Sequence, residues 1–231
     1  MATYVLVHGA WHGGWCWRRV ADRLIDHGHT VYTPTLTGVG ERSHLRTRDT
    51  DLTTQITDVV NVMKWEDLND IVLVGHSYGG FVISGVVEHM ESAISSIVYL
   101  DAFLPEDGDC LADNWTPERR KTLYEQAETG EPTPPFAAEF FAVNAADRDW
   151  VDNKCTPHPA KCFTERLKLT GARERIANKT YIYASGWNSH FTPSYEKAKA
   201  DPSWRVLTLP CGHDVMLDMP DELSEILLTT A

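Results

Sequence analysis

The sequence predicts an α/β fold: a mostly parallel sheet of about six strands, with helices on both faces and an inserted helical cap. Short apolar runs alternate with helical patterns along most of the chain. Several of these runs contain no polar residue, which is typical of strands covered on both faces. The alternation fails between residues 103 and 178. We therefore expect a single domain, residues 1–231, with one insertion.

Six apolar runs are expected to form the strands of the sheet. They are Tyr4–Val7, Thr30–Tyr32, Ile71–Val74, Ile97–Leu100, Thr180–Tyr183 and Arg205–Leu209. The helical patterns between or after them are Gly14–His27, Leu52–Trp65, Gly79–Glu91, Pro193–Lys199 and Pro220–Thr229. Thr192 before Pro193 predicts an N-cap followed by proline at the first helical position.

The insertion, residues 103–178, is predicted to form a helical cap over the carboxyl edge of the sheet. Open α/β sheets bind their ligands at that edge. The stretch holds a helical pattern at Arg119–Thr129 and a second amphipathic pattern at Cys162–Ile176, with the aromatic segment Phe136–Phe141 between them, and none of its segments has a convincing strand pattern. A purely structural appendage is the alternative interpretation.

Composition limits the partners of this chain. The formal net charge of −12 argues against nucleic acid and anionic membranes. No apolar run approaches the roughly 18 residues of a membrane span. The N-terminus enters a strand pattern at once, without the basic and apolar regions of a secretory signal, which favours the cytoplasm.

The five cysteines are odd in number and scattered, so free thiols are expected. Cys155 and Cys162, with His158 between them, have the composition of half a metal site or of a small disulfide loop. The chain has a single cluster of this kind, and Pro157 and Pro159 stiffen it, so we expect no metal.

The segment Gly75-His76-Ser77-Tyr78-Gly79 matches the pattern G-x-S-x-G. An apolar strand pattern precedes it and a helix pattern follows, which is the setting of a nucleophile elbow. The sharp turn would expose the Ser77 hydroxyl beside the helix N-terminus. Ser77 is therefore the predicted nucleophile, and a glycine-rich turn without chemistry is the alternative. The side chain of His76 is expected to point away from the site.

His213 is the predicted general base. It lies in Gly212-His213-Asp214, directly after the last strand, and so at the same sheet edge as Ser77. The loop after the penultimate strand, residues 185–189, contains no carboxylate. Asp101 directly follows the strand one earlier, so we assign it as the acid that orients His213. A turn cap is the alternative role for Asp101, and Asp113 is the next candidate acid.

The first loop is predicted to complete an oxyanion hole. Glycines surround Ala10, whose backbone N–H is expected to lie opposite that of Tyr78. A dinucleotide-binding loop is the alternative, but the pattern G-x-G-x-x-G is absent from the sequence. The aromatic residues Trp11, Phe103 and Trp187 fall in edge loops and are candidate walls of the substrate pocket.

Three segments together resemble a known family. They are Val5–Trp15, Gly75–Gly80, and Gly212–Met216 with Pro220. They resemble α/β-hydrolases of the group that contains plant hydroxynitrile lyases, salicylate-binding methyl-ester esterases and bacterial esterase relatives. The resemblance implies an α/β-hydrolase fold with a six-stranded core, a lid over a largely apolar pocket, and often a homodimer.

Two departures from that group bear on the reaction. Its hydroxynitrile lyases have a lysine after the catalytic histidine and a threonine in the first loop, where this chain has Asp214 and Gly9. An aspartate cannot stabilise departing cyanide, so hydrolysis of small to medium apolar or aryl esters is favoured, without a cofactor. The missing acid after the penultimate strand is the second departure. A lyase, another hydrolase reaction on the same residues and a small-molecule receptor remain alternatives.

Overall fold

The computed structural model describes residues 1–230. Its sheet is parallel throughout, in the order β2-β1-β3-β4-β5-β6. Each predicted strand is present: β1 (Thr3–Val7), β2 (Thr30–Tyr32), β3 (Ile71–His76), β4 (Ile94–Leu100), β5 (Asn178–Ala184) and β6 (Trp204–Leu209). Because parallel strands need crossover connections, the helices between them cover both faces.

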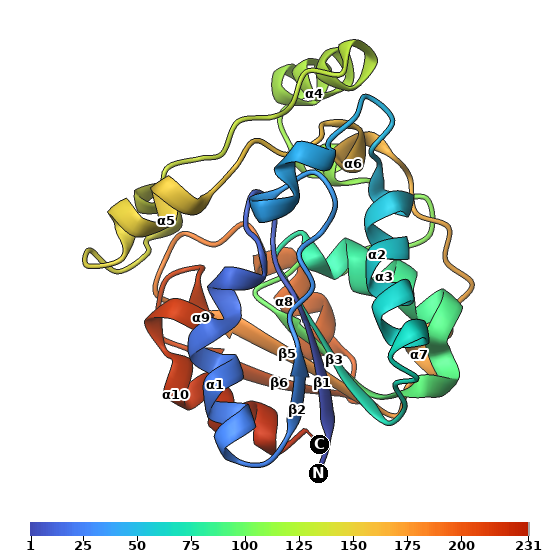
Figure 1. Cartoon of the computed structure of the whole chain (residues 1–231), viewed down its shortest axis with the longest axis vertical. Helices are drawn as coiled ribbons and strands as arrows, with labels where there is room; N and C mark the ends of the chain where they lie inside the picture. Colours follow the sequence, from blue (N-terminus) through green and yellow to red (C-terminus); the bar gives the residue numbers. More distant parts are fainter. Residues whose placement is uncertain (231) are drawn as a thin grey trace.

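Helices α1 (Arg18–Asp26), α9 (Val215–Asp218) and α10 (Pro220–Leu228) lie on one face of the sheet (Figure 1). Helices α2 (Leu52–Trp65), α3 (Gly79–Met90) and α8 (Thr192–Ala200) cover the other face. Alternate residues of β1 show the division: Tyr4 and Leu6 pack into one core, and Val5 and Val7 into the other. The alternation puts apolar side chains into both layers, which explains the unbroken apolar runs.

The remaining helices of the main body are short. They are the 3₁₀ turns η1 (Gly14–Trp17), η2 (Gly40–Leu45) and η3 (Glu91–Ala93). The predicted helix Gly14–His27 is therefore a 3₁₀ turn followed by α1. The predicted cap at Thr192 was wrong, because α8 begins at Thr192 and its N-cap is Phe191. The Thr192 hydroxyl donates to the Ser189 carbonyl instead.

The segment between β4 and β5 carries helices above the carboxyl edge of the sheet (Figure 1). These are η4 (Leu111–Asn114), α4 (Pro117–Thr129), η5 (Ala138–Phe141), α5 (Arg148–Lys154), α6 (Lys161–Thr164) and, lower beside α3, α7 (Ala172–Arg175). An isolated antiparallel bridge joins Thr133 to His158.

The expectation of a helix over Cys162–Ile176 was wrong. The chain between α6 and α7 is not helical. The Leu167 N–H donates to the Asp109 carbonyl at 2.9 Å, and the Leu169 N–H donates to the Asp107 carboxylate at 2.8 Å. These bonds to a distant loop replace the bonds that a helix would make within itself.

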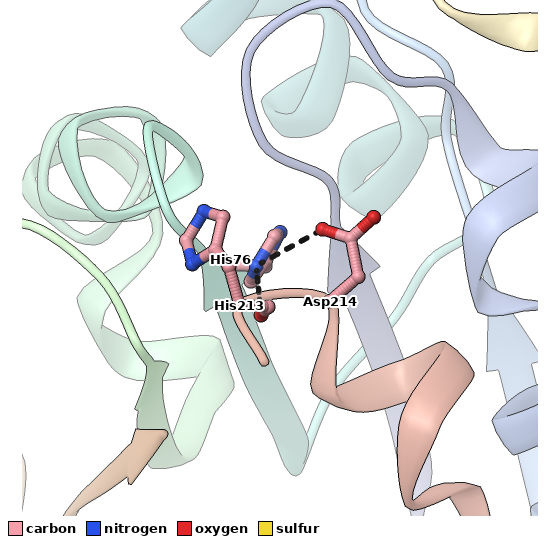
Figure 2. A group of neighbouring side chains, drawn as sticks. All are labelled: His76, His213 and Asp214. Carbon is pink, nitrogen blue, oxygen red and sulfur yellow. Dashed lines mark hydrogen bonds and ion pairs between the residues drawn. The ribbon is translucent and has the colours of Figure 1, made fainter. Parts of the chain in front are cut away.

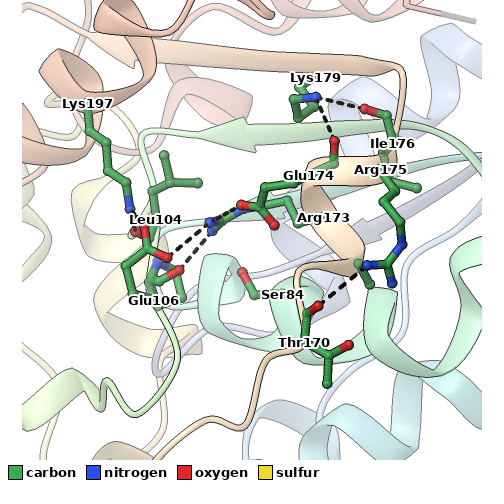
Figure 3. A network of polar contacts seen from close by, with 12 residues as sticks. Ser84, Leu104, Glu106, Thr170, Arg173, Glu174, Arg175, Ile176, Lys179 and Lys197 are labelled. Atoms are coloured by element: carbon green, nitrogen blue, oxygen red, sulfur yellow. Dashed lines mark hydrogen bonds and ion pairs between the residues drawn. The ribbon is translucent and has the colours of Figure 1, made fainter.

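A polar network around Arg173 ties the two ends of this segment together (Figure 3). The Arg173 side chain is buried, donates to the Pro105 carbonyl at 2.8 Å and pairs with Glu174 at 2.6 Å. Glu106, which follows β4, pairs with both Arg173 and Lys197. The helices above the sheet are thereby anchored at their base.

Among residues 1–230, no helix combines the length and the apolar character that are needed to cross a membrane.

Candidate active site

Ser77 lies in the sharp turn from β3 to α3, with a left-handed backbone φ of 57°. Its N–H donates to the Leu100 carbonyl at 3.2 Å, and its own carbonyl accepts from the N–H groups of Gly80 and Phe103. A serine with this φ is strained, and such strain persists where the surrounding structure enforces it. The side chain lines a cavity at the carboxyl edge of the sheet.

The glycines around Ser77 are required by close backbone contacts. A Cβ on Gly75 would lie 2.7 Å from the Gly79 carbonyl oxygen, and a Cβ on Gly80 would lie 2.1 Å from the Phe103 carbonyl oxygen. A Cβ on Gly9 would lie 2.8 Å from the Ser77 Cβ. The first loop and the loop after β4 therefore pack directly against the turn that carries Ser77.

Asp101 follows β4 at the same edge and is fully buried. Its backbone is also left-handed, with φ of 38°, and its N–H donates to the Ile182 carbonyl at 2.7 Å. The Asp101 Oδ2 lies 2.7 Å from the His213 Nδ1. The structure thus brings the predicted acid and the predicted base together.

The loop after β5 supplies further donors to Asp101. Trp187 Nε1–H donates to Oδ2 at 3.0 Å, the Ser189 hydroxyl donates to Oδ1 at 3.3 Å, and the Ala184 N–H also reaches Oδ1. Burial raises the pKa of Asp101 to about 7, and these donors favour the ionised carboxylate. Sequence reasoning missed this role of Trp187, because its signal was only that of an aromatic residue in an edge loop.

His213 follows β6 and lies among aromatic rings of the cavity wall. Its ring stacks on Phe191 with centroids 5.0 Å apart, and Trp187 and Phe141 lie at 5.0 Å and 5.1 Å. Burial lowers the pKa of His213 to about 3, so the imidazole is neutral at pH 7. A neutral imidazole whose Nδ1–H is held by Asp101 leaves Nε2 able to accept a proton.

The expectation that His76 points away from the site was wrong. His76 Nε2–H donates to the His213 carbonyl at 3.0 Å, and the two rings lie 4.3 Å apart (Figure 2). His76 thereby ties the turn that carries Ser77 to the loop that carries His213. Among the hydrogen bonds of residues 1–230, none joins the Ser77 hydroxyl to His213 directly.

His76, His213 and Asp214 also form a group whose potential ligand atoms lie within 4.8 Å of one another (Figure 2). Hydrogen bonds account for this arrangement. His76 donates to a backbone carbonyl, His213 is held by Asp101, and Asp214 Oδ2 accepts from His12 at 3.0 Å. Each of the three side chains is therefore held by at least one hydrogen bond within the protein, while His76 Nδ1 and Asp214 Oδ1 are buried without a partner among the described residues.

The structure does not join the cysteine pair and the histidine considered from the sequence into one site. Cys155 contacts His12, Cys162 contacts the Thr50 carbonyl, and His158 contacts Gln55. All five cysteines are free thiols.

The Ala10 and Tyr78 N–H groups both belong to residues that line the cavity. Within the described chain neither N–H donates a hydrogen bond, whereas the neighbouring Trp11 N–H donates to His158 Nδ1 at 3.2 Å. Unused backbone donors beside a strained serine are the arrangement that an oxyanion requires.

Buried histidines hold the peptides of this first loop. His8 Nδ1–H donates to the Gly9 carbonyl at 2.8 Å, and its Nε2 accepts from the Leu36 N–H at 3.1 Å. The Gly9 carbonyl and the Ala10 N–H belong to one planar trans peptide, so they point in opposite directions. By binding the Gly9 carbonyl on the side away from the cavity, His8 therefore fixes the direction of the Ala10 N–H.

His12 holds the next peptide of the loop. Its Nδ1 lies 2.8 Å from the Ala10 carbonyl and its Nε2 lies 3.0 Å from Asp214 Oδ2. A carbonyl and a carboxylate only accept, so both ring nitrogens carry protons and His12 is an imidazolium. Burial alone would lower the pKa of His12, but Cys155 and Asp214 raise it well above its usual value.

The cavity beside Ser77 encloses about 160 Å³ and has mainly aromatic walls. That volume is on the order of ten times the space that one buried water needs. Trp11, Phe103 and Trp187 line it, and Trp11 has a left-handed φ of 66°. Trp150 of the segment above the sheet does not line the cavity; it packs on Trp15, with ring centroids 4.9 Å apart.

Comparisons with known proteins identify relatives of this chain. The chain is 43% identical to the carbendazim hydrolyzing esterase of Nocardioides sp. (strain SG-4G), over 97% of this chain and 98% of that protein. It is 33% identical to methylesterase 10 of Arabidopsis thaliana, over 97% of this chain and 90% of that protein.

A solved structure has the same fold over the whole chain. It is an extracellular alpha/beta-hydrolase from a Paenibacillus species, described as sharing structural and functional homology with tobacco salicylic acid binding protein 2. The TM-score is 0.85 at 27% sequence identity, and the match covers 100% of this chain and 99% of that one. The Alpha/beta hydrolase family matches residues 4–226. The chain therefore belongs to the alpha/beta hydrolase family, as an esterase of the carboxylesterase type.

Proposed function

We propose that this protein is a serine carboxylic-ester hydrolase that acts on small to medium apolar or aryl esters. Ser77 is the nucleophile, His213 the general base and Asp101 the acid that orients the base. The observation that carries the proposal is the 2.7 Å contact between His213 Nδ1 and Asp101 Oδ2, beside a serine in a strained turn. That arrangement supports a Ser-His-Asp triad, in which the acid holds one ring nitrogen of the base and the other faces the serine.

In the acylation step, His213 Nε2 takes the proton of the Ser77 hydroxyl as its oxygen attacks the ester carbonyl carbon. The contact between these two atoms forms as the substrate binds, as is common in unliganded hydrolases. The N–H groups of Ala10 and Tyr78 stabilise the oxyanion, and each such donor is worth about 3 kcal/mol in measured cases. His213 then protonates the leaving alcohol.

In the deacylation step, His213 removes a proton from water, which attacks the acyl group on Ser77. The same N–H groups stabilise the second oxyanion, and the acid leaves as the Ser77 hydroxyl re-forms. No cofactor takes part in this sequence. Asp101 holds one tautomer of His213 throughout and stabilises the imidazolium that forms in each step.

The cavity walls support an aromatic or apolar substrate. The relatives point the same way, because one is a carbendazim hydrolyzing esterase and another is a methylesterase. We propose that residues 103–178 form the cap that closes over such a substrate, with Trp11, Phe103 and Trp187 as walls. A cytoplasmic location and a homodimer remain predictions, for cell fractionation and size-exclusion chromatography to test.

Cyanohydrin cleavage is disfavoured by the two positions that depart from the lyases. Gly9 leaves no room for a threonine, because even a Cβ there would lie 2.8 Å from the Ser77 Cβ. Asp214 is committed to His12 and supplies no cation for cyanide. A receptor role is separated from catalysis by the turnover number, which in typical enzymes exceeds about 1 per second.

The test is hydrolysis of p-nitrophenyl esters of increasing acyl length by the wild type and by Ser77→Ala. We expect turnover with an optimal chain length, and its loss in Ser77→Ala with the fold unchanged by circular dichroism. Ser92→Ala, at an exposed position, is the matched control. Activity that survives in Ser77→Ala contradicts the proposal, and a single burst without turnover favours a receptor.

A further inference from the structure

Arg119 lines the cavity, and its side chain makes no hydrogen bond or ion pair with any other residue of the chain that the structure describes. It is part of the cavity wall with the rings of Trp115 and Phe136. Its Nε is shielded from solvent and makes no hydrogen bond among the described residues. Its guanidinium carbon lies 5.7 Å from the centre of the Phe136 ring.

The other arginines of the chain are partnered. Arg120, its neighbour on α4, pairs with Asp113 at 2.8 Å, and Arg166 pairs with the same carboxylate at 2.8 Å. Every remaining arginine has its guanidinium in a hydrogen bond or ion pair with a carboxylate, a carbonyl or a hydroxyl. Within residues 1–230, Arg119 stands apart from this pattern.

Helix stability does not explain the position of Arg119. It lies in the first turn of α4, after the Thr116 cap, where the helix dipole disfavours a cation. Two other polar side chains of the cavity wall are satisfied within the protein, since Thr133 donates to Gln126 and Asn114 donates to backbone carbonyls. Arg119 is the one arginine or lysine of this wall, and its guanidinium makes no hydrogen bond within residues 1–230.

No aspartate or glutamate lines the cavity, so the charge of Arg119 is not compensated there. A planar oxygen acceptor on a bound substrate would satisfy both the unused donors and the charge, because guanidinium and carboxylate match in two parallel hydrogen bonds. Ser77 and the N–H groups of Ala10 and Tyr78 lie in the same cavity and would hold the ester group.

We propose that Arg119 is a specificity-determining residue, which selects aryl esters that carry an oxygen acceptor, foremost a carboxylate, remote from the scissile ester. This inference rests on the esterase function proposed above. It deepens that function by giving the substrate two recognised ends. The aromatic body packs between the rings, the ester lies at Ser77, and the acceptor lies at the guanidinium of α4.

The test compares kcat/KM for methyl esters that differ at one end. Methyl benzoate has no remote acceptor, methyl 4-carbamoylbenzoate has a neutral one, and monomethyl terephthalate has a carboxylate. Methyl 4-(carboxymethyl)benzoate extends the carboxylate by one carbon. We expect one of the carboxylate esters to exceed methyl benzoate by about 10- to 100-fold, the worth of one hydrogen-bonded charged group, with the amide between them.

Arg119→Met keeps an aliphatic side chain and removes the guanidinium donors. The ratio of kcat/KM for the preferred carboxylate ester to kcat/KM for methyl benzoate should then fall close to one. Arg119→Lys should keep part of the preference for the carboxylate ester over methyl benzoate. Arg120→Met on the same helix is the matched control and should leave the ratio unchanged. A purely structural Arg119 would lower the melting temperature without changing the ratio, which would overturn the inference.

Failure of the two proposals can be distinguished. If wild-type hydrolysis of methyl benzoate depends on Ser77 but the carboxylate esters are not preferred, the inference on Arg119 fails and the esterase function stands. If no ester in the series is hydrolysed in a Ser77-dependent way, and the p-nitrophenyl esters are not hydrolysed either, the proposed function itself fails.

Discussion

His12 and Asp214 form a buried pair directly behind the proposed catalytic site, with Nε2 and Oδ2 3.0 Å apart. Asp214 follows His213 in the chain, and the other ring nitrogen of His12 holds the Ala10 carbonyl. The pair thus connects the loop of the proposed base with the loop of the proposed oxyanion donor. Asp214 keeps His12 protonated, and a protonated His12 can donate to both loops at once.

Asp214→Asn should lower kcat by about 10-fold with a smaller change in KM. The amide oxygen can still accept from His12, but a neutral His12 loses its second N–H and therefore its bond to the Ala10 carbonyl. The cost of one such hydrogen bond to a charged group is about 1.5–3 kcal/mol. Steady-state kinetics on a p-nitrophenyl ester measure the effect.

Asp221→Asn is the control for Asp214→Asn, because Asp221 forms an ion pair with Arg23 at an exposed position. It should leave kcat unchanged, since exposed pairs contribute little. If Asp214→Asn lowers stability and leaves kcat at the wild-type value, the pair has only a structural role.

Trp187→Phe removes the Nε1–H that donates to Asp101 Oδ2 at 3.0 Å. Without this donor the carboxylate form of Asp101 is less favoured, so the pKa of Asp101 rises further. The acidic limb of the kcat profile should therefore move to higher pH, and kcat at pH 7 should fall by about 10-fold.

Phe103→Leu is the comparison for Trp187→Phe. Phe103 lines the same cavity and makes no hydrogen bond to Asp101. Its replacement should change KM without moving the pH profile. An unshifted acidic limb in Trp187→Phe would mean that Trp187 acts only as a wall of the cavity.

Gly9→Ala should reduce kcat strongly in a protein that still folds. The new Cβ would lie 2.8 Å from the Ser77 Cβ and 3.0 Å from His76 Nδ1, so the first loop must move and carry the Ala10 N–H away from the oxyanion. Loss of one oxyanion donor costs about 100-fold or more in kcat in measured cases.

Gly108→Ala separates this effect from general destabilisation. Gly108 has a left-handed φ of 83°, and no atom lies within 4 Å of the place that a Cβ would take, so alanine there costs on the order of 1 kcal/mol of stability. Both variants should lose stability, but only Gly9→Ala should lose turnover. Equal kcat values in the two variants would contradict a role for the Gly9–Ala10 peptide.

Stability should fall as the pH falls below about 6.5, because several histidines are buried in neutral form. Burial lowers the pKa of His8, His76 and His213 to about 3, and it lowers the pKa of His158 well below its usual value. Between those values and 6.5 the unfolded chain binds more protons than the folded one. In that range each of these histidines lowers the free energy of unfolding by about 1.4 kcal/mol for every unit by which the pH falls. Urea unfolding at pH 7.5, 6.5, 5.5 and 4.5 measures this slope of stability against pH.

His158→Gln should flatten this slope by about 1.4 kcal/mol per pH unit, because the glutamine amide keeps an acceptor for the Trp11 N–H and does not titrate. His27→Gln, at an exposed position, should not change the slope. The same slope in both variants would contradict the buried-histidine explanation.

The sequence was sufficient to predict the sheet, because each strand is an apolar run in a βαβ pattern and both faces of the sheet are covered. The helix expected at Leu52–Trp65 has the same first and last residues in the structure, because the Asp51 side chain caps it and its apolar residues recur at a regular helical spacing. Cys162–Ile176 was misjudged because its backbone bonds go to residues 107–109, far away in the chain. Local periodicity carries no signal of such partners.

For the candidate site, chain position was enough to place Ser77, Asp101 and His213 at one edge of the sheet. It gave no sign that Trp187, in the loop where an acid was missing, would donate to the acid on the neighbouring strand. The inward ring of His76 was also missed, because the direction of a side chain in a strained turn depends on the tertiary packing.

The left-handed residues of the site limit how this enzyme can be improved. Trp11, Ser77 and Asp101 each keep a positive φ that a glycine would adopt without strain. Relief of that strain would return roughly 1–2 kcal/mol at each position. Glycine at Trp11 or Asp101 would lose more than this, because it removes a buried ring or a buried carboxylate with its hydrogen bonds. The Ser77 hydroxyl makes no hydrogen bond within residues 1–230, so a directed-evolution screen that rewards heat resistance alone should enrich glycine at Ser77 and recover inactive clones. Turnover and heat resistance have to be selected in the same round.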